Sequence, residues 1–186
     1  MTAAATELLL RVQIAGVVDR DAALSGSVDE RTISELVAQD ALADDGGSLY
    51  VTENGDQLLT RLLRADPDHE AALLPFFDEF SVLDLELKAA LTAWQRAQRE
   101  DDQDGQLTAV ESWLDVDSRL SDAATDAVRA VVGRYLDQLH AAREAVLDGK
   151  TDQLSGTDDT SYHSSWFVLH EVLIRSLGRS RGDGAS

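Results

Sequence analysis

From Phe76 to the last residue the chain contains no proline, and apolar side chains recur along it at intervals of three and four residues. The pattern is clearest in the segment 76–100, whose apolar side chains include Phe80, Leu83, Leu87, Leu91 and Trp94. Side chains spaced in this way lie on one face of a helix and turn that face toward a core. Because helical spacing resumes in 107–149 and in 161–179, the sequence predicts an α-helical domain over residues 76–180.

Both prolines of the chain, Pro67 and Pro75, precede this helical region. Proline interrupts regular backbone hydrogen bonding, so two prolines close together favour a boundary between domains. We therefore expect an N-terminal domain over residues 1–65, a linker over residues 66–75 and a disordered tail over residues 181–186.

The first third of the chain carries a more varied set of patterns. Helical spacing is present over 6–18 and 28–42, with a short segment and a Gly-containing turn between them. A β-prone stretch over 48–52 lies between two turn signals, at 44–47 and at 53–55, and helical spacing resumes over 56–66. The predicted order is helix, short helix, helix, β-hairpin and helix, in a chain that is mainly α-helical.

A resemblance to a known family lies in three stretches, "LSGS" at 24–27, "LVAQDAL" at 36–42 and "LYVTENGDQLL" at 49–59. The region of roughly residues 5–65 resembles the winged-helix (MarR/ArsR-like) family of bacterial transcription regulators. In that family Tyr, Thr and Gly recur at the positions of Tyr50, Thr52 and Gly55. Two further stretches, "LKAALTAWQ" at 87–95 and "SYHSSWFVLHEVLIRSLGR" at 161–179, extend a resemblance over the whole chain to uncharacterised actinobacterial proteins that join a winged helix to a helical C-terminal domain.

The resemblance implies a recognition helix over residues 29–42 that enters the major groove of DNA. The side chains that would face DNA are Glu30, Arg31, Ser34, Glu35 and Ala38. Arg31 is the leading candidate for a phosphate or base contact, and Ser34 is the second, because such contacts are made by cationic and hydrogen-bonding side chains. Where the family often carries a basic residue after the glycine of its wing, this chain has Asp56.

The charge of the chain opposes DNA binding. Asp and Glu total 35 against 16 Lys and Arg, for a net charge of −19, and residues 1–64 contain 11 acidic and 5 basic side chains. A surface of this sign repels phosphate, whereas binding to DNA depends on cations that neutralise phosphates. Two interpretations of the N-terminal domain therefore stay open. It is either a DNA-binding module or a winged helix that contacts another protein.

Aromatic and histidine side chains are concentrated in the predicted last helix, 161–179. Five of them are candidates for lining the pocket of a small anionic effector: Tyr162, His163, Trp166, Phe167 and His170. The alternative is that each histidine covers the edge of the core and forms local hydrogen bonds. The two histidines are about 10.5 Å apart along a helix, so they lack the i, i+4 spacing of a metal-binding pair.

No motif in the sequence indicates an enzyme, a cofactor or a metal site. Cysteine is absent, which excludes disulfides and Cys-based zinc sites, and neither a Gly-rich phosphate loop nor a nucleophile elbow occurs. No apolar run of about 18 residues predicts a membrane span, and the N-terminus lacks the features of a secretory signal. A cytoplasmic location is therefore expected.

The sequence thus favours a transcriptional regulator whose winged helix binds DNA and whose helical domain binds a small-molecule effector or forms a homodimer. Dimerisation would place two weak DNA-binding surfaces side by side and raise the apparent affinity. The alternative is an acidic accessory or scaffold protein that does not bind DNA and contacts a protein partner.

Overall fold

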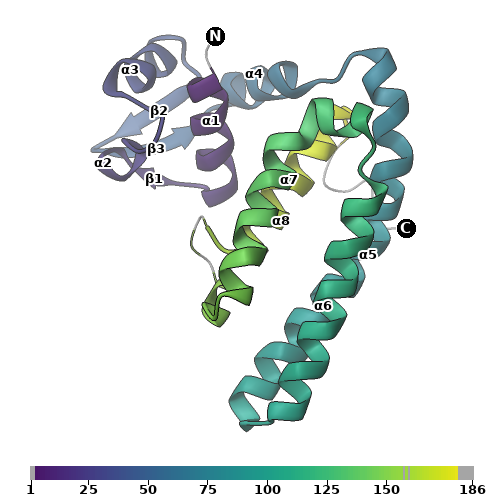
Figure 1. The fold of residues 1–186 in the computed structure, drawn as a ribbon. Helices are drawn as coiled ribbons and strands as arrows, with labels where there is room; N and C mark the ends of the chain where they lie inside the picture. Colours follow the sequence, from purple (N-terminus) through teal and green to yellow (C-terminus); the bar gives the residue numbers. More distant parts are fainter. Residues whose placement is uncertain (1–2, 157, 159, 180–186) are drawn as a thin grey trace. The chain divides into compact units, whose positions relative to one another are not determined.

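The computed structural model describes residues 3–156, 158 and 160–179. This part of the chain contains eight α-helices, a short 3₁₀ helix and a three-stranded antiparallel sheet (Figure 1). The prediction of a mainly α-helical chain with a small β element is therefore confirmed. The chain divides into two compact units, of which the first ends at Arg64 and the second begins at Ala65. The expected disordered tail, 181–186, lies outside the described residues.

The first unit is built from helices and a small sheet. Its elements are α1 (Ala3–Ala15), β1 (Val18–Asp19), α2 (Arg20–Ala23), α3 (Glu30–Ala38), β2 (Leu42–Asp45), β3 (Ser48–Val51) and α4 (Glu53–Leu63). Strand β3 is central and pairs antiparallel with β1 and with β2, while α1 contacts α3, α4 and β3. The core consists of the buried side chains of Leu8, Leu9, Val12, Ile33, Leu36, Leu42, Leu49 and Leu59.

The β-hairpin of the first unit turns at two glycines. Gly46 and Gly47 have φ angles of 61° and 90°, and they connect Asp45 and Ser48, which are paired residues of β2 and β3. A two-residue turn with positive φ at both positions matches the right-handed twist of the strands, and glycine adopts it without a steric penalty. The turn signal at 44–47 in the sequence is thus confirmed.

Helix α3 ends at Ala38, earlier than the predicted recognition helix over 29–42. Asp40 adopts a left-handed backbone conformation with φ 54°, and the N–H of Ala41 donates to the carbonyl of Leu36 at 2.8 Å. These features terminate the helix, so that Leu42, the last residue of the predicted recognition helix, instead begins β2.

The segment 53–55, which was predicted to be a turn, forms the first turn of α4. Thr52 caps the helix, because its hydroxyl oxygen accepts a hydrogen bond from the Gly55 N–H at 3.0 Å. Asp56 consequently lies in α4 and not at the tip of the hairpin, which corrects its assignment to the wing position.

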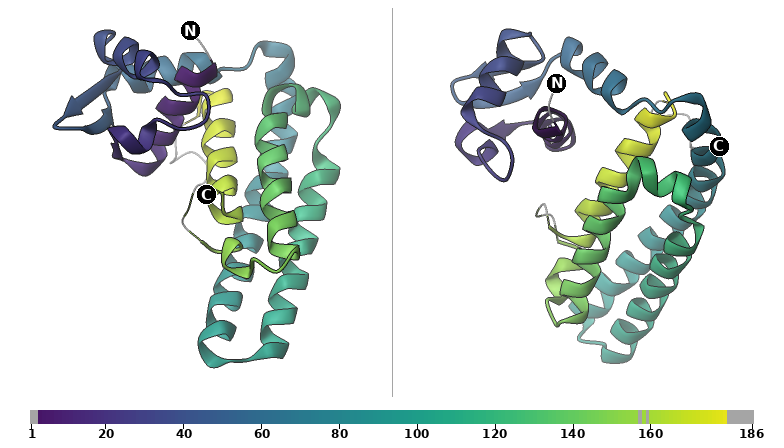
Figure 2. Two further views of the ribbon diagram at one scale, coloured as in Figure 1. Left: turned by 60° about the vertical axis from the view of Figure 1, so that its left-hand side comes forward. Right: turned by 45° about the horizontal axis from the view of Figure 1, so that its top comes forward.

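The second unit is entirely helical within the described residues. Its elements are α5 (Pro67–Glu100), α6 (Gln103–Ala123), α7 (Asp126–Leu147), the 3₁₀ helix η1 (Thr151–Gln153) and α8 (Tyr162–Ser176). Helices α5 and α6 form a long antiparallel pair, and α7 and α8 lie beside one part of it, beyond which the end of the pair extends (Figure 2). The largest fully buried side chains are those of Trp113, Tyr162 and Phe80.

The predicted linker, residues 66–75, is wrong, because this segment forms the start of α5. Asp66 caps the helix by accepting a hydrogen bond from the His69 N–H at 3.0 Å, and Pro67 occupies the first helical turn. Proline is favoured there because the missing N–H would have no partner inside the helix. Pro75 lies within the same helix, where it removes one backbone hydrogen bond without ending the helix.

Candidate functional site

Arg31 and Ser34, the predicted DNA contacts, are both exposed on α3. The Arg31 side chain is 83% exposed, and its Nε donates to the Glu35 carboxylate at 2.7 Å. The guanidinium is therefore paired with a carboxylate one helical turn further along the same helix. An exposed pair of this kind contributes little stability, but it compensates the positive charge of the leading candidate for a phosphate contact.

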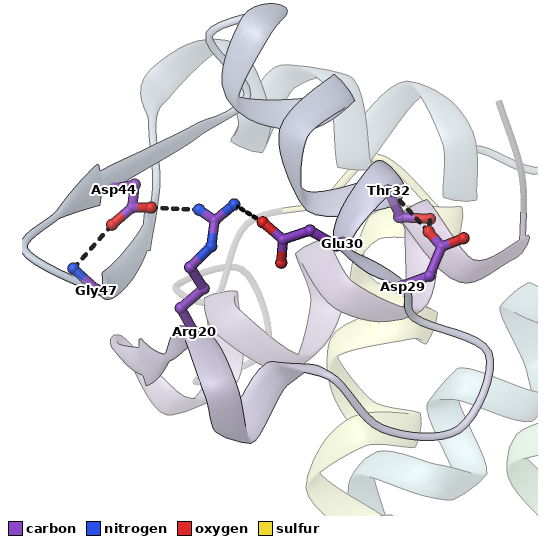
Figure 3. Close-up of polar contacts among 6 residues, drawn as sticks. All are labelled: Arg20, Asp29, Glu30, Thr32, Asp44 and Gly47. Atoms are coloured by element: carbon purple, nitrogen blue, oxygen red, sulfur yellow. Dashed lines mark hydrogen bonds and ion pairs between the residues drawn. The ribbon is translucent and has the colours of Figure 1, made fainter.

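A second arginine, which the sequence did not single out, lies at the start of α2. The guanidinium of Arg20 lies between the carboxylate of Glu30, at the start of α3, and that of Asp44, in β2 (Figure 3). Asp44 also accepts a hydrogen bond from the Gly47 N–H at 2.9 Å, so the cluster links α2, α3 and the β2–β3 hairpin. We call these three charged residues, Arg20, Glu30 and Asp44, the Arg20 cluster.

The N-terminus of α3 carries a further carboxylate. Asp29 accepts hydrogen bonds from the N–H and the hydroxyl of Thr32, at 2.8 and 2.7 Å, and thereby caps the helix (Figure 3). These two hydrogen bonds lower the pKa of Asp29 below its ordinary value, and the bond from the hydroxyl has the larger effect. Asp29 and Glu35 therefore place carboxylate groups before and after Arg31 along the chain.

The five residues of the predicted effector wall do not share one environment. Tyr162 and Trp166 are buried in the core of the second unit, whereas His163 and Phe167 are exposed on α8 and His170 is half-buried. Ser161 caps this helix, because its hydroxyl oxygen accepts a hydrogen bond from the Ser164 N–H at 3.1 Å. Effector binding by these five residues stays a prediction.

Packing accounts for the buried members of this group. The Trp166 ring stacks on Phe80 with centroids 4.6 Å apart, and its indole nitrogen donates to the Asp84 carboxylate at 3.0 Å. The His170 ring lies 5.4 Å from the Phe80 ring, and Tyr162 contacts Trp113 edge to face at 5.1 Å. These contacts agree with the alternative in which the last helix packs on the core with histidine at its edge.

A buried carboxylate that the sequence analysis missed connects three helices of the second unit. Asp117 of α6 is 9% exposed, and one of its oxygens accepts a hydrogen bond from the Tyr162 hydroxyl of α8 at 3.0 Å. Its other oxygen lies 3.0 Å from Nε of Arg143 in α7. Burial raises the pKa of Asp117, although Tyr162 and Arg143 oppose the effect, and burial together with Asp117 raises the pKa of Tyr162 well above 10.0.

A cavity of about 200 Å³ lies beside this carboxylate, between α6 and α7. Its polar lining comes from Asp117, Ser121, Arg129, Asp137 and His140, and leucine side chains supply the rest. The structure therefore places a buried, hydrogen-bonded carboxylate at the wall of a cavity of the size of a small molecule. We call this region the Asp117 cavity.

Replacing Asp117 with asparagine is expected to change how stability depends on pH. Because the pKa of Asp117 is raised in the folded state, its contribution to stability is greatest below the ordinary value of 3.8 and falls as pH rises through the raised pKa. Urea unfolding across a pH series should show the wild type losing stability relative to Asp117→Asn as pH rises. Parallel pH profiles of the two proteins would contradict this expectation.

The described residues contain no group of three or more His, Asp or Glu side chains arranged to hold a metal ion. Within the same residues, no helix combines the length and the apolar character of a membrane span. No protein-family model, no curated protein and no solved structure matches the chain.

Proposed function

We propose that the first unit is a winged-helix module and that its acidic α3 surface binds a basic segment of a partner protein. Support for the winged helix comes from the order of its elements, in which α1, β1, α2 and α3 precede the β2–β3 hairpin. The central position of β3, between β1 and β2, fits the same arrangement. The protein would then act as an adaptor, with the helical second unit as its other part.

The observation that carries this proposal is the pairing of both arginines near α3 with carboxylates. Arg20 is held by Glu30 and Asp44, and Arg31 is paired with Glu35. Binding to DNA gains its affinity when unpaired cations neutralise phosphates and release counterions. A surface whose cations are already compensated is better suited to lysine and arginine side chains of a protein.

The proposal is tested by binding of a fluorescent, arginine-rich peptide, measured by anisotropy at about 50 mM salt. We expect the double variant Glu30→Gln and Glu35→Gln to bind the peptide about tenfold more weakly than the wild type. Two carboxylates at the contact surface are lost, and the guanidinium groups that they compensated, those of Arg20 and Arg31, then repel the cationic peptide. The matched control removes the same charge from exposed positions of the second unit, with Glu100→Gln and Glu111→Gln. Equal weakening by both double variants would show nonspecific attraction to an acidic protein and contradict the proposal.

Sequence-specific DNA binding is the second candidate function, and it is favoured by the order of elements and by the exposure of Arg31. It predicts that purified protein retains defined genomic fragments at low salt and that Arg31→Glu abolishes the retention. Such a result would replace the adaptor with a transcriptional regulator. If wild type and variant retain no fragments, the adaptor is supported.

Several expectations from the sequence stay predictions. These concern the small-molecule effector, the homodimer, the cytoplasmic location and the absence of enzymatic activity. The oligomeric state has a direct bearing on the second candidate function, because two copies would present two α3 surfaces to neighbouring stretches of DNA.

A further inference from the structure

We propose that the Asp117 cavity of the second unit binds a small organic cation that carries a primary ammonium group. The inference concerns only α6, α7 and α8, and it is independent of the function proposed for the first unit. It rests on the carboxylates at the cavity wall, on the partners of the nearby arginines and on the size of the cavity.

The Asp117 carboxylate has the capacity to bind a ligand in addition to its present partners. Each of its oxygens has one partner, Tyr162 at 3.0 Å or Arg143 at 3.0 Å, whereas a carboxylate offers about four acceptor sites in total. Asp137 places a second carboxylate on the lining of the same cavity. An ammonium group has three N–H donors, which two carboxylates and the Ser121 hydroxyl are suited to accept.

The arginines near the cavity already have partners. Arg129, which lines the cavity, donates from Nε to the Ala124 carbonyl at 3.2 Å and from a terminal nitrogen to the Ser121 carbonyl at 3.5 Å. Arg143 is engaged by Asp117 and by Glu144. Arg129 keeps its positive charge, because its partners are neutral carbonyls, and His140 also lines the cavity, whereas the charge of Arg143 is compensated by two carboxylates. An anionic ligand would still meet the carboxylates of Asp117 and Asp137, and the net charge of −19 favours cations near the protein.

The cavity also sets the size of the ligand and gives it an apolar side. Leu120, Leu136 and Leu139 contribute the apolar part of the lining. An apolar cavity of about 150 Å³ accommodates benzene, so a volume of about 200 Å³ corresponds to a ligand of roughly six to ten non-hydrogen atoms. A ring or short chain attached to the ammonium group would contact the leucines, as in most small-molecule sites.

Calorimetric titration with benzylammonium, benzyl alcohol and benzoate, at constant ionic strength, separates the contributions of charge and size. We expect benzylammonium to bind at a single site with a Kd of about 1 mM or tighter. Benzyl alcohol and benzoate should bind at least about tenfold more weakly, because neither presents a cation to the carboxylates. Benzoate binding as tightly as benzylammonium, or no saturable binding of benzylammonium, would overturn the proposal.

Variants of the cavity wall locate the binding site. Asp117→Asn and Asp137→Asn should each weaken benzylammonium binding about tenfold, and Ser121→Leu should abolish it by filling space. The matched control is Asp115→Asn, which removes the same charge from a side chain of α6 that is 68% exposed. If Asp117→Asn fails to fold, Asp137→Asn and Ser121→Leu still decide the question. Equal weakening by Asp115→Asn and Asp137→Asn would show diffuse attraction and exclude a site.

Discussion

Substitution of Gly55 by alanine is expected to lower the free energy of unfolding of the first unit by about 3 kcal/mol. A Cβ atom at this position would lie 2.0 Å from the backbone oxygen of Ala41 and 3.0 Å from a methyl group of Val51. Both neighbours belong to the sheet region, where backbone atoms move only if β2 or α4 shifts. Urea unfolding followed through amide signals of α4 and β3 measures the loss.

The matched control is Gly133→Ala, which makes the same change in the middle of α7. Its Cβ atom would meet only the Cβ of Arg129, at an ordinary contact distance of 3.8 Å. Alanine favours a helix over glycine, so this variant should gain roughly 0.5–1 kcal/mol of stability. Equal effects of the two substitutions would contradict the close approach of α4 to the backbone at Ala41.

Gly55 also illustrates what the sequence was able to predict and what it was not. The stretch around it was identified by resemblance, and its tyrosine, threonine and glycine were assigned to a hairpin followed by a turn. The structure explains the threonine as a helix cap and the glycine as the place where α4 approaches the backbone of Ala41, just before β2. The contact is tertiary, between Gly55 and Ala41, and no local pattern in either segment encodes it.

Elements that depend on local chemistry were predicted well. The Gly46–Gly47 turn follows from residues that lie next to each other in the sequence. The proline signal was misassigned because proline marks both a domain boundary and the first turn of a helix. Asp66, which caps the helix just before Pro67, is the additional signal that distinguishes the second case.

The candidate sites depend on contacts between distant segments, and this limited their prediction. The position of Asp117 on the buried face of α6 is implied by its spacing from Trp113 and Leu120, which follow core periodicity. Its partners are not implied, since Tyr162 is 45 residues away and belongs to another helix. Similarly, Arg20 and Asp44 are 24 positions apart in the sequence. The positive charge of Arg20 is therefore compensated only once the chain has folded, and the sequence alone does not indicate it.

Replacing Trp113 with alanine is expected to cost the second unit about 4 kcal/mol of stability. The side chain is fully buried, at 0% exposure, and its ring contacts Tyr162 edge to face with centroids 5.1 Å apart. Removal of the indole leaves a large cavity and also ends the aromatic contact, which contributes beyond burial alone. The fluorescence of the two remaining tryptophans, Trp94 and Trp166, reports the urea unfolding transition of this unit.

Two further variants distinguish the loss of packing from the loss of the polar group. The indole nitrogen of Trp113 is buried and has no hydrogen bond of ordinary geometry, although it is close enough to the Tyr162 hydroxyl to oppose the rise in the pKa of that group. Trp113→Phe therefore removes a poorly satisfied donor along with part of the ring. Because the loss of a poorly satisfied donor is favourable, Trp113→Phe should lower stability by only about half as much as Trp113→Ala. Leu107→Ala, on the same helix at a side chain that is 64% exposed, should change stability by no more than about 0.5 kcal/mol. If Trp113→Ala were as mild as Leu107→Ala, Trp113 would not be a core residue, and the packing that positions Tyr162 against Asp117 would have to be reconsidered.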